Sequence, residues 1–165
     1  LTLEQFHKAT KIPVVILLDD IRSMHNVGSI FRTSDAFLVK KIYLCGITAQ
    51  PPHREIQKTA LGATESVEWE YRKNAVELVG DLKKEGYKII CVEQADEVCQ
   101  LQDFLPYKDG NYCLVFGHEM YGVKEELVKA SDTVLEIPQF GTKHSLNISV
   151  SVGIVVWDFF RKLMF

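Results

Sequence analysis

Short apolar runs rich in β-branched residues alternate with helical patterns along this chain, and this alternation limits the folds that it can adopt. Val14–Leu18 and Lys41–Cys45 are typical of buried strands. Between them, from Val27 to Leu38, apolar residues recur at the spacing of one face of a helix. A strand, a helix and a second strand in this order form a right-handed parallel crossover. The pattern of the N-terminal part of the chain therefore predicts a βαβ unit, the first of an α/β domain.

The same alternation continues almost to the C-terminus. Further strands are predicted at Val67–Tyr71, Tyr87–Val92, Tyr112–Phe116 and Thr133–Ile137. Further helices are predicted at Arg54–Leu61, Asn74–Lys84, Lys124–Ala130 and Leu146–Leu163. A chain of 165 residues, 47% of them hydrophobic, is long enough for one full core. We expect a single α/β domain over residues 1–165, with a mostly parallel sheet flanked by helices and a short lead-in at 1–12.

Two of the predicted helices have features that bear on function. In the first, Asn26 stands where an N-cap belongs, and Gly28, Arg32 and Asp35 lie on the face turned away from the core. The last helix is apolar around most of its circumference and must be covered on most sides. A subunit interface would cover it, and so would a position wedged between the sheet and another helix. Its apolar residues are Val150, Val152, Ile154, Val155, Val156, Trp157, Phe159 and Phe160.

Three segments place glycine beside Asn, Ser, Glu or Arg at a junction between a strand and a helix. They are His25–Arg32, Phe116–Gly122 and Ile137–Asn147. Ligands of parallel sheets bind beyond the carboxyl ends of the strands, where all three segments are expected. The sequence therefore predicts one site assembled from several loops.

Charge, cysteine and histidine patterns narrow the classes of function. The net charge is −3, but residues 62–109 carry 6 Lys/Arg against 11 Asp/Glu, so most of the basic residues lie elsewhere, near the unusual loops. They could attract an anionic ligand or be solvated loop charges.

The four cysteines lack CxxC spacing, which favours reduced structural thiols over a metal or redox site. The histidines form no metal-binding pair, and no apolar run is long enough to span a membrane. We expect no metal and a cytoplasmic location.

Taken together, three motifs resemble those of the SpoU/TrmH family of S-adenosylmethionine-dependent RNA ribose 2′-O-methyltransferases, in the SPOUT class. The motifs are Asn26-x-Gly28-x-x-x-Arg32, Gly117-x-Glu119-x-x-Gly122 and Ile137-Pro138…Gly141…Ser145-Leu146-Asn147, in the order and spacing of the family. The likeness extends over roughly residues 13–162. Gln139 departs from it, because a Met is common at that position, and Ser149–Ser151–Gly153 replaces a start of the last helix that is richer in Ala.

The resemblance implies a deep trefoil knot, within about residues 112–165, in which S-adenosyl-L-methionine binds. It also implies a homodimer formed through the knot and the last helix. By analogy with the family's loops, the cofactor contacts are expected from Glu93, Gly117, Ile137, Ser145 and Leu146.

The resemblance further implies catalytic roles for Asn26, Arg32, Glu119, Ser145 and Asn147. A guanidinium with a pKa above about 12 is a poor base. We therefore expect Arg32, fixed by Asn26, to clamp the target phosphate and to stabilise the developing alkoxide. Outside the motif, Arg32 would form only a weak surface pair with Asp35. Glu119 is expected to position a loop or an Arg, or to complement the start of the helix at Lys124–Ala130.

The resulting prediction is a 2′-O-methyltransferase that acts on tRNA or rRNA, with a slight preference for tRNA. Ser145 and Asn147 are expected to face the reacting ribose, although Ser145 alone would be taken for a helix N-cap. The RNA-binding residues are expected to be Arg22, His25, Arg32, Arg54, Lys58 and Lys143. One alternative is a catalytically silent RNA-binding protein with the same fold, and another is base methylation on that scaffold. A nucleotide-dependent oxidoreductase is excluded because no GxGxxG follows the first strand.

Overall fold

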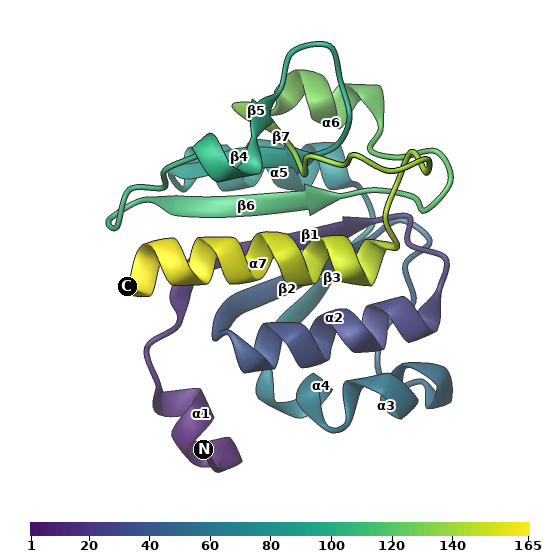
Figure 1. The fold of residues 1–165 in the computed structure, drawn as a ribbon. Helices are drawn as coiled ribbons and strands as arrows, with labels where there is room; N and C mark the ends of the chain where they lie inside the picture. The colour runs from purple at the N-terminus through teal and green to yellow at the C-terminus, as the bar shows by residue number, and fades with distance from the viewer.

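A seven-stranded sheet, parallel throughout, forms the middle layer of the computed structural model, which describes residues 1–165 (Figure 1). Its strands are arranged in the order β3-β2-β1-β6-β4-β7-β5. All six strand pairs are parallel, so the carboxyl ends of the strands meet at one edge of the sheet. The predicted α/β fold with a parallel sheet is thus confirmed. The strands are β1 Ile12–Asp19, β2 Val39–Cys45, β3 Trp69–Arg72, β4 Tyr87–Val92, β5 Cys99–Gln100, β6 Asn111–Phe116 and β7 Thr133–Glu136.

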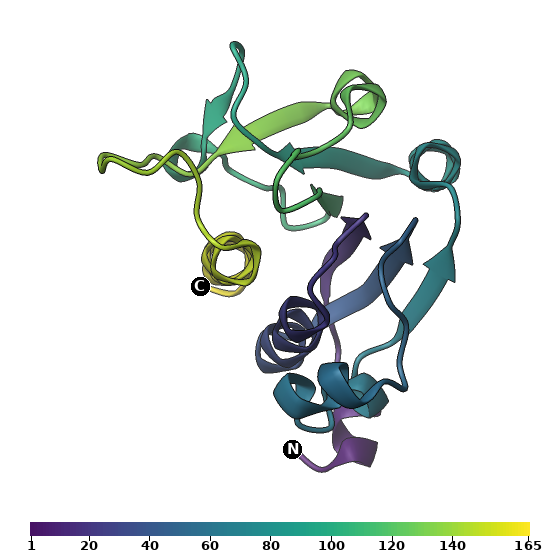
Figure 2. The same ribbon diagram turned by 90° about the vertical axis from the view of Figure 1, so that its right-hand side faces the viewer.

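Helices cover both faces of this sheet (Figures 1 and 2). On one face, α2, α3, α4 and α7 enclose the larger core of 28 buried residues. On the other face, α5 and α6 enclose a second core of 14 buried residues. Helix α1 lies beside α4 at the outer end of the first layer. The helices are α1 Leu3–Lys8, α2 Met24–Ala36, α3 Arg54–Ala60, α4 Ala63–Ser66, α5 Ala75–Lys84, α6 Glu125–Ala130 and α7 Ile148–Met164, with a 3-10 turn at Leu101–Asp103.

The four cysteines are unpaired, and three of them are buried in strands. Burial raises the pKa of the Cys45 and Cys91 thiols to about 12. These thiols are therefore protonated at neutral pH and serve as small apolar side chains.

The start of α2 differs from the prediction. Ser23, not Asn26, is the N-cap, because its hydroxyl oxygen accepts the Asn26 N–H at 3.1 Å. The helix thus begins almost a turn earlier, and Asn26 lies within its first turn. Gly28 is buried rather than outward-facing, because α3 packs against it: a Cβ at Gly28 would lie 2.0 Å from Thr59 Oγ1. Asp35 accepts the Ser66 hydroxyl and makes no ion pair with Arg32; that pair was the alternative to the role that the resemblance implies for Arg32.

Helix α7 is enclosed on one face only. Val152, Val155 and Phe159 are completely buried against the sheet and the neighbouring helices. Val150, Ile154 and Trp157 lie on the other face and are 49%, 37% and 44% exposed. The helix is therefore not wedged inside its own chain, and an apolar strip is left uncovered. No helix of the chain combines the length and the apolar character needed to cross a membrane.

Candidate active site

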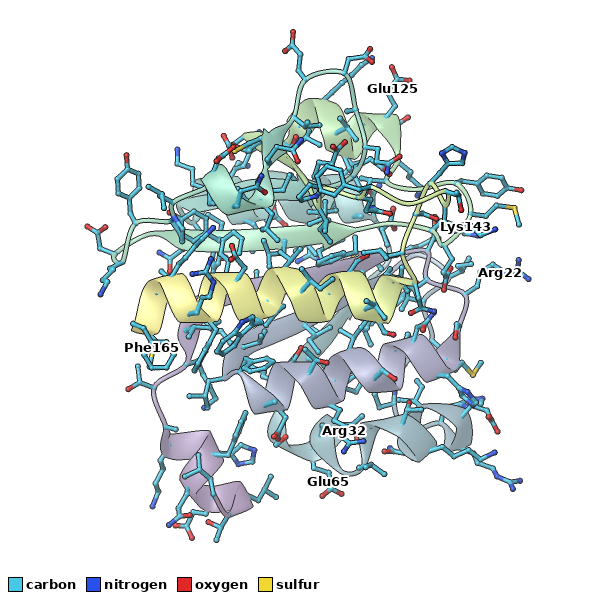
Figure 3. The ribbon with its side chains drawn as sticks, viewed as in Figure 1. Arg22, Arg32, Glu65, Glu125, Lys143 and Phe165 are labelled. Atoms are coloured by element: carbon cyan, nitrogen blue, oxygen red, sulfur yellow. The ribbon has the colours of Figure 1, made fainter.

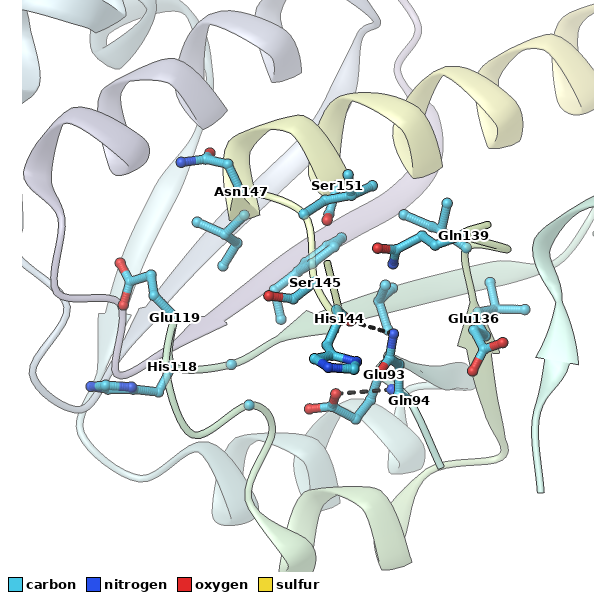
Figure 4. Close-up of a pocket in the computed structure, with 18 of the residues that line it drawn as sticks. Glu93, Gln94, His118, Glu119, Glu136, Gln139, His144, Ser145, Asn147 and Ser151 are labelled. Carbon is cyan, nitrogen blue, oxygen red and sulfur yellow. Dashed lines mark hydrogen bonds between the residues drawn. The ribbon is translucent and has the colours of Figure 1, made fainter. Parts of the chain in front are cut away.

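A pocket of about 360 Å³ lies beyond the carboxyl ends of β4, β6 and β7 (Figure 4). Its wall is formed by the segments that follow these three strands and by the start of α7. All five predicted cofactor residues line it, namely Glu93, Gly117, Ile137, Ser145 and Leu146. Two of the three sequence motifs therefore converge on one hollow.

Main-chain groups in this wall are left without partners inside the chain. The N–H and C=O groups of Gly117, Ile137 and Leu146 make no hydrogen bond to the rest of the protein. At Glu93 only the main-chain carbonyl is without a hydrogen-bond partner, because the Glu93 N–H donates to Leu135 O at 3.0 Å. Polar main-chain groups that face a pocket without partners are suited to bind a polar ligand.

The Glu93 side chain fastens two of the loops together. Its Oε2 accepts the Val123 N–H at 2.8 Å, and its Oε1 accepts the Gln94 N–H at 2.9 Å. Gly122 has a φ of +73°, and a Cβ there would lie 2.1 Å from Glu93 Oε2. Both facts require glycine at this position. The Glu93 carboxylate thus shapes the wall, and Gly122 makes room for it.

Glu119 connects the second motif to the beginning of α2. Its carboxylate accepts the main-chain N–H groups of Arg22 and Ser23 at 3.0 and 2.9 Å. Burial would raise the pKa of Glu119, but hydrogen bonds from main-chain N–H groups, those of Arg22 and Ser23 foremost, and nearby positive charge together outweigh burial and hold that pKa below its ordinary value. Glu119 therefore stays ionised and positions the loop before α2, rather than complementing α6.

Asn147, not Ser145, caps α7. The Asn147 Oδ1 atom accepts the Ser149 N–H at 2.9 Å and the Ser149 hydroxyl at 2.7 Å. Its amide nitrogen is left free to donate. Ser145 lies two residues earlier on the pocket wall, and its hydroxyl makes no hydrogen bond within the chain. Figure 4 shows Ser145 and Asn147 on the same side of the pocket as Glu119.

Arg32 and Asn26 do not line this pocket within the same chain. Arg32 lies in the third turn of α2, beside a separate hollow that is also lined by Asp35 and Glu65 (Figure 3). Its guanidinium is exposed and makes no ion pair or hydrogen bond within the chain. In a single copy of the protein Arg32 therefore lies outside the pocket, although Glu119 ties the start of α2 to the second motif.

The predicted RNA-binding residues fall into three places. Arg22 and Lys143 lie next to pocket residues, at the same edge of the molecule in Figure 3. His25 and Lys58 both contact Glu55, at 2.6 and 3.0 Å, so that carboxylate offsets part of their charge. Arg54 is exposed in α3 without an ion pair, and Arg32 is isolated on α2. The six residues do not form one patch on one copy.

Several pocket residues were not among the predicted site residues. Gln94 Nε2 donates to His144 O at 2.6 Å and so joins the loop after β4 to the third motif (Figure 4). His118, Gln139 and Ser151 also line the wall. His118 and Gln139 stand inside the second and third motifs, which was the available signal for them, whereas Gln94 and Ser151 lie outside all three motifs. Nowhere in the chain do three or more His, Cys, Asp or Glu side chains gather as metal ligands.

The model of the SpoU rRNA Methylase family matches residues 13–157. The chain belongs to this family. It is 30% identical over 148 residues to the Neisseria meningitidis protein named 23S rRNA (guanosine-2′-O-)-methyltransferase RlmB, a match that covers 87% of this chain and 56% of that protein. A putative TrmH family tRNA/rRNA methyltransferase of Staphylococcus haemolyticus is 28% identical over 163 residues and is 64% covered. The chain thus spans less than two thirds of these relatives.

Solved structures of the family have the same fold. The Aquifex aeolicus TrmH/SpoU tRNA modifying enzyme superposes with a TM-score of 0.84 at 26% identity, covering 98% of this chain and 84% of the other. The AdoMet-bound rRNA methyltransferase from Sinorhizobium meliloti superposes with a TM-score of 0.86 at 25% identity, covering 99% and 61%. The one is described as acting on tRNA and the other on rRNA.

Proposed function

We propose that this chain is the catalytic domain of an RNA 2′-O-methyltransferase that transfers a methyl group to a ribose hydroxyl of tRNA or rRNA. The observation that carries the proposal is the pocket beyond β4, β6 and β7. There the free main-chain groups of Gly117, Ile137 and Leu146 meet the side chains of Ser145 and Asn147. The relative named as a guanosine 2′-O-methyltransferase supports the ribose as acceptor.

S-adenosyl-L-methionine is the cofactor, and the residues of the pocket fit it. The free N–H and C=O groups match the hydrogen-bonding edges of an adenosine. The loop that forms this part of the wall requires glycine at position 117, since a Cβ there would lie 2.4 Å from Gly122 O. Glu93, Glu119 and Glu136 give the pocket a negative potential that favours a sulfonium. The cofactor supplies an activated methyl group, so the protein has mainly to align it with the acceptor oxygen.

Asn147 and Arg32 have separate tasks in this proposal. The free amide nitrogen of Asn147 can donate to an oxygen of the ribose or its phosphate. Arg32 binds the phosphate and stabilises the alkoxide that develops on the 2′-oxygen. Glu119 is a positioning residue, because both of its oxygens already accept main-chain N–H groups.

Arg32 must reach the pocket from a second copy of the chain. We propose a homodimer in which α2 of one copy lies against the pocket of the other, with the exposed strip of α7 in the interface. The position of Arg32 outside its own pocket and the uncovered Val150, Ile154 and Trp157 support this arrangement. We also propose the deep knot for residues 112–165; the contact of Gln94 with His144 supports the passage of the third motif beside the loop after β4.

Methyl transfer from radiolabelled S-adenosyl-L-methionine to bulk tRNA and to rRNA, both from cells lacking this protein, tests the function. We expect one of the two RNAs to be labelled, and alkali-resistant dinucleotides after digestion to place the label on a ribose. Label on a base would contradict the 2′-O assignment. Cofactor and RNA binding without any transfer would favour the catalytically silent alternative.

Arg32→Ala is expected to retain cofactor affinity while turnover falls at least about 100-fold, because a donor aimed at the developing charge is lost. Isothermal titration with the cofactor and single-turnover methylation measure the two effects. Lys83→Ala, which removes an exposed cation from α5 on the opposite face of the sheet, is the control and should leave both unchanged. Undiminished methylation by Arg32→Ala would refute the role of Arg32.

Mixed dimers test whether the site is shared. Arg32→Ala and Asn147→Ala should each be inactive as homodimers. If each site takes one residue from each copy, mixing the two variants restores about a quarter of the sites, because half of the dimers are mixed and each has one intact site. If both residues act within one copy, every site carries one substitution and no activity returns.

A further inference from the structure

Two large side chains stand exposed at the rim of the cofactor pocket without a role in the fold. Tyr121 is 81% exposed and Met120 is 71% exposed, in the short loop between Gly117 and Gly122. Met120 and His118, from the same loop, line the pocket itself, and His118 is labelled in Figure 4. An aromatic ring beside a polar pocket, unused by any core, is available to a ligand that reaches over that pocket.

The loop holds the tyrosine ring in one place. His118 and Gly122 close the loop by mutual main-chain hydrogen bonds of 3.1 and 2.8 Å. Inside it, the His118 Nδ1 atom accepts the N–H groups of Met120 and Tyr121 at 3.0 and 3.2 Å. The Tyr121 ring stacks on the His118 ring with 4.7 Å between centroids and 24° between planes. One face of the ring is thus backed by the imidazole and the other is open.

The loop is also fastened at both ends to the rest of the site. Glu119 binds the main chain of Arg22 and Ser23, and Val123 donates to Glu93. The ring is therefore in place before a ligand arrives, so that little conformational entropy is lost on binding.

We infer that Tyr121, backed by His118, is a platform on which an unpaired base of the substrate RNA stacks beside the methylated nucleotide. This inference rests on the proposed function and adds a positioning residue for its RNA. Unpaired bases are commonly recognised on aromatic side chains, and every base offers a face for stacking. Arg22 and Lys143, next to the pocket, carry the positive charge that the RNA backbone requires. That charge favours RNA over a protein partner at this rim.

Tyr121→Ala and Tyr107→Ala form a matched pair. Tyr107 is 77% exposed and precedes β6, whereas Tyr121 follows β6, so the two lie beyond opposite ends of one strand. Tyr121→Ala should weaken RNA binding about tenfold, as loss of one base stack of ~1–3 kcal/mol implies. Tyr121→Phe should retain most of the affinity. Tyr107→Ala should bind RNA as the unmodified protein does. None of the three should change cofactor affinity.

The readouts are the dissociation constant for fluorescently labelled tRNA and rRNA fragments, the KM and kcat for RNA, and the cofactor dissociation constant. We expect Tyr121→Ala to raise KM for RNA and to leave kcat at saturating RNA nearly unchanged. The same RNA affinity for Tyr121→Ala and Tyr107→Ala would overturn the inference. So would a loss of cofactor affinity in Tyr121→Ala, which would mean that the ring merely supports the pocket, or a change in its oligomeric mass, which would make Tyr121 a subunit contact.

The binding readout separates this inference from the proposed function. If the unmodified protein transfers no methyl group but Tyr121→Ala alone loses RNA affinity, the function fails and the platform stands. If methylation occurs and Tyr121→Ala binds RNA normally, the function stands and the platform fails.

Discussion

Glu119 shows how one side chain can join two segments that are far apart in the sequence. Its carboxylate receives N–H groups from the loop before α2, almost a hundred positions earlier in the chain. Because these donors hold the pKa of Glu119 below its ordinary value, the folded protein binds a proton at this carboxyl less readily than the unfolded chain. The carboxylate therefore stabilises the fold at neutral pH, and this contribution is lost in acid.

Glu119→Gln should lower the free energy of unfolding at pH 7, by less than about 1 kcal/mol because the side chain is exposed. The difference from the unmodified protein is complete above about pH 4.3, the ordinary value for glutamate, and shrinks as the pH falls through the lower value of the folded state. Urea denaturation between pH 3 and 7 measures it. Glu126→Gln, an exposed residue without an ion pair, is the control. A difference between the two variants that persists unchanged at pH 3 would contradict this explanation.

At this scale the sequence identified the five residues expected to contact the cofactor as pocket residues, but not the partners of their side chains. Glu93, Gly117, Ile137, Ser145 and Leu146 were predicted from the resemblance to the family and line the pocket. The cap of α2 was wrongly predicted, because more than one residue near the helix start is of a cap-forming type. Ser23 caps α2 in place of Asn26, and α7 is capped by Asn147, which was expected only to face the ribose. Ser and Asn have similar preferences for the N-cap position, so the local sequence does not distinguish between them. Which residue caps the helix depends on how the helix packs in the folded protein.

The contact between α2 and α3 depends on the absence of one side chain. At Gly28, a Cβ would lie 2.0 Å from Thr59 Oγ1 and 2.3 Å from Ile56 O. The helix pattern alone placed Gly28 on the outer face, because the sequence does not show which helix will pack there. Glycine is here a condition for two helices to approach each other closely.

Gly28→Ala should destabilise the protein by roughly 1–3 kcal/mol, since the added methyl group meets main-chain atoms that cannot move aside easily. Gly80→Ala is the matched control, in the middle of α5 with no atom within 4 Å of its Cβ position. That substitution should stabilise by about 0.5–1 kcal/mol through helix propensity. Thermal melts of both variants measure the difference. Equal shifts in the same direction would contradict the crowding at Gly28.

The whole molecule leaves one apolar strip uncovered on α7, on the side away from the sheet. Sequence patterning predicted that this helix needs cover, and the structure shows that its own chain covers one face only. The strand order could not be predicted in the same way. The local sequence pattern does not show that β6 lies between β1 and β4 in the sheet. The elements α1, α4 and β5 were not predicted, because they are too short to produce a clear hydrophobic periodicity.

Ile154→Glu should convert the proposed dimer into monomers, because it would place a charge in the apolar interface. Val76→Glu, at a residue of similar exposure on α5, should leave the dimer intact. Light scattering after size-exclusion chromatography gives the masses, and thermal melts check folding. Methyl transfer should fall together with dimer content if the site is shared. Equal masses for the two variants would place the interface elsewhere.

The strand order has a consequence for the growing chain on the ribosome. β1, β2 and β3 can pair as soon as they emerge, but β4 has no neighbour until β6 and β7 have been synthesised. The pocket is completed late, because residues from Val92 up to Ser151 contribute to its wall. A polypeptide whose translation stops before Ile137 can therefore pair its first three strands and yet lack the pocket that is proposed for the methyl donor.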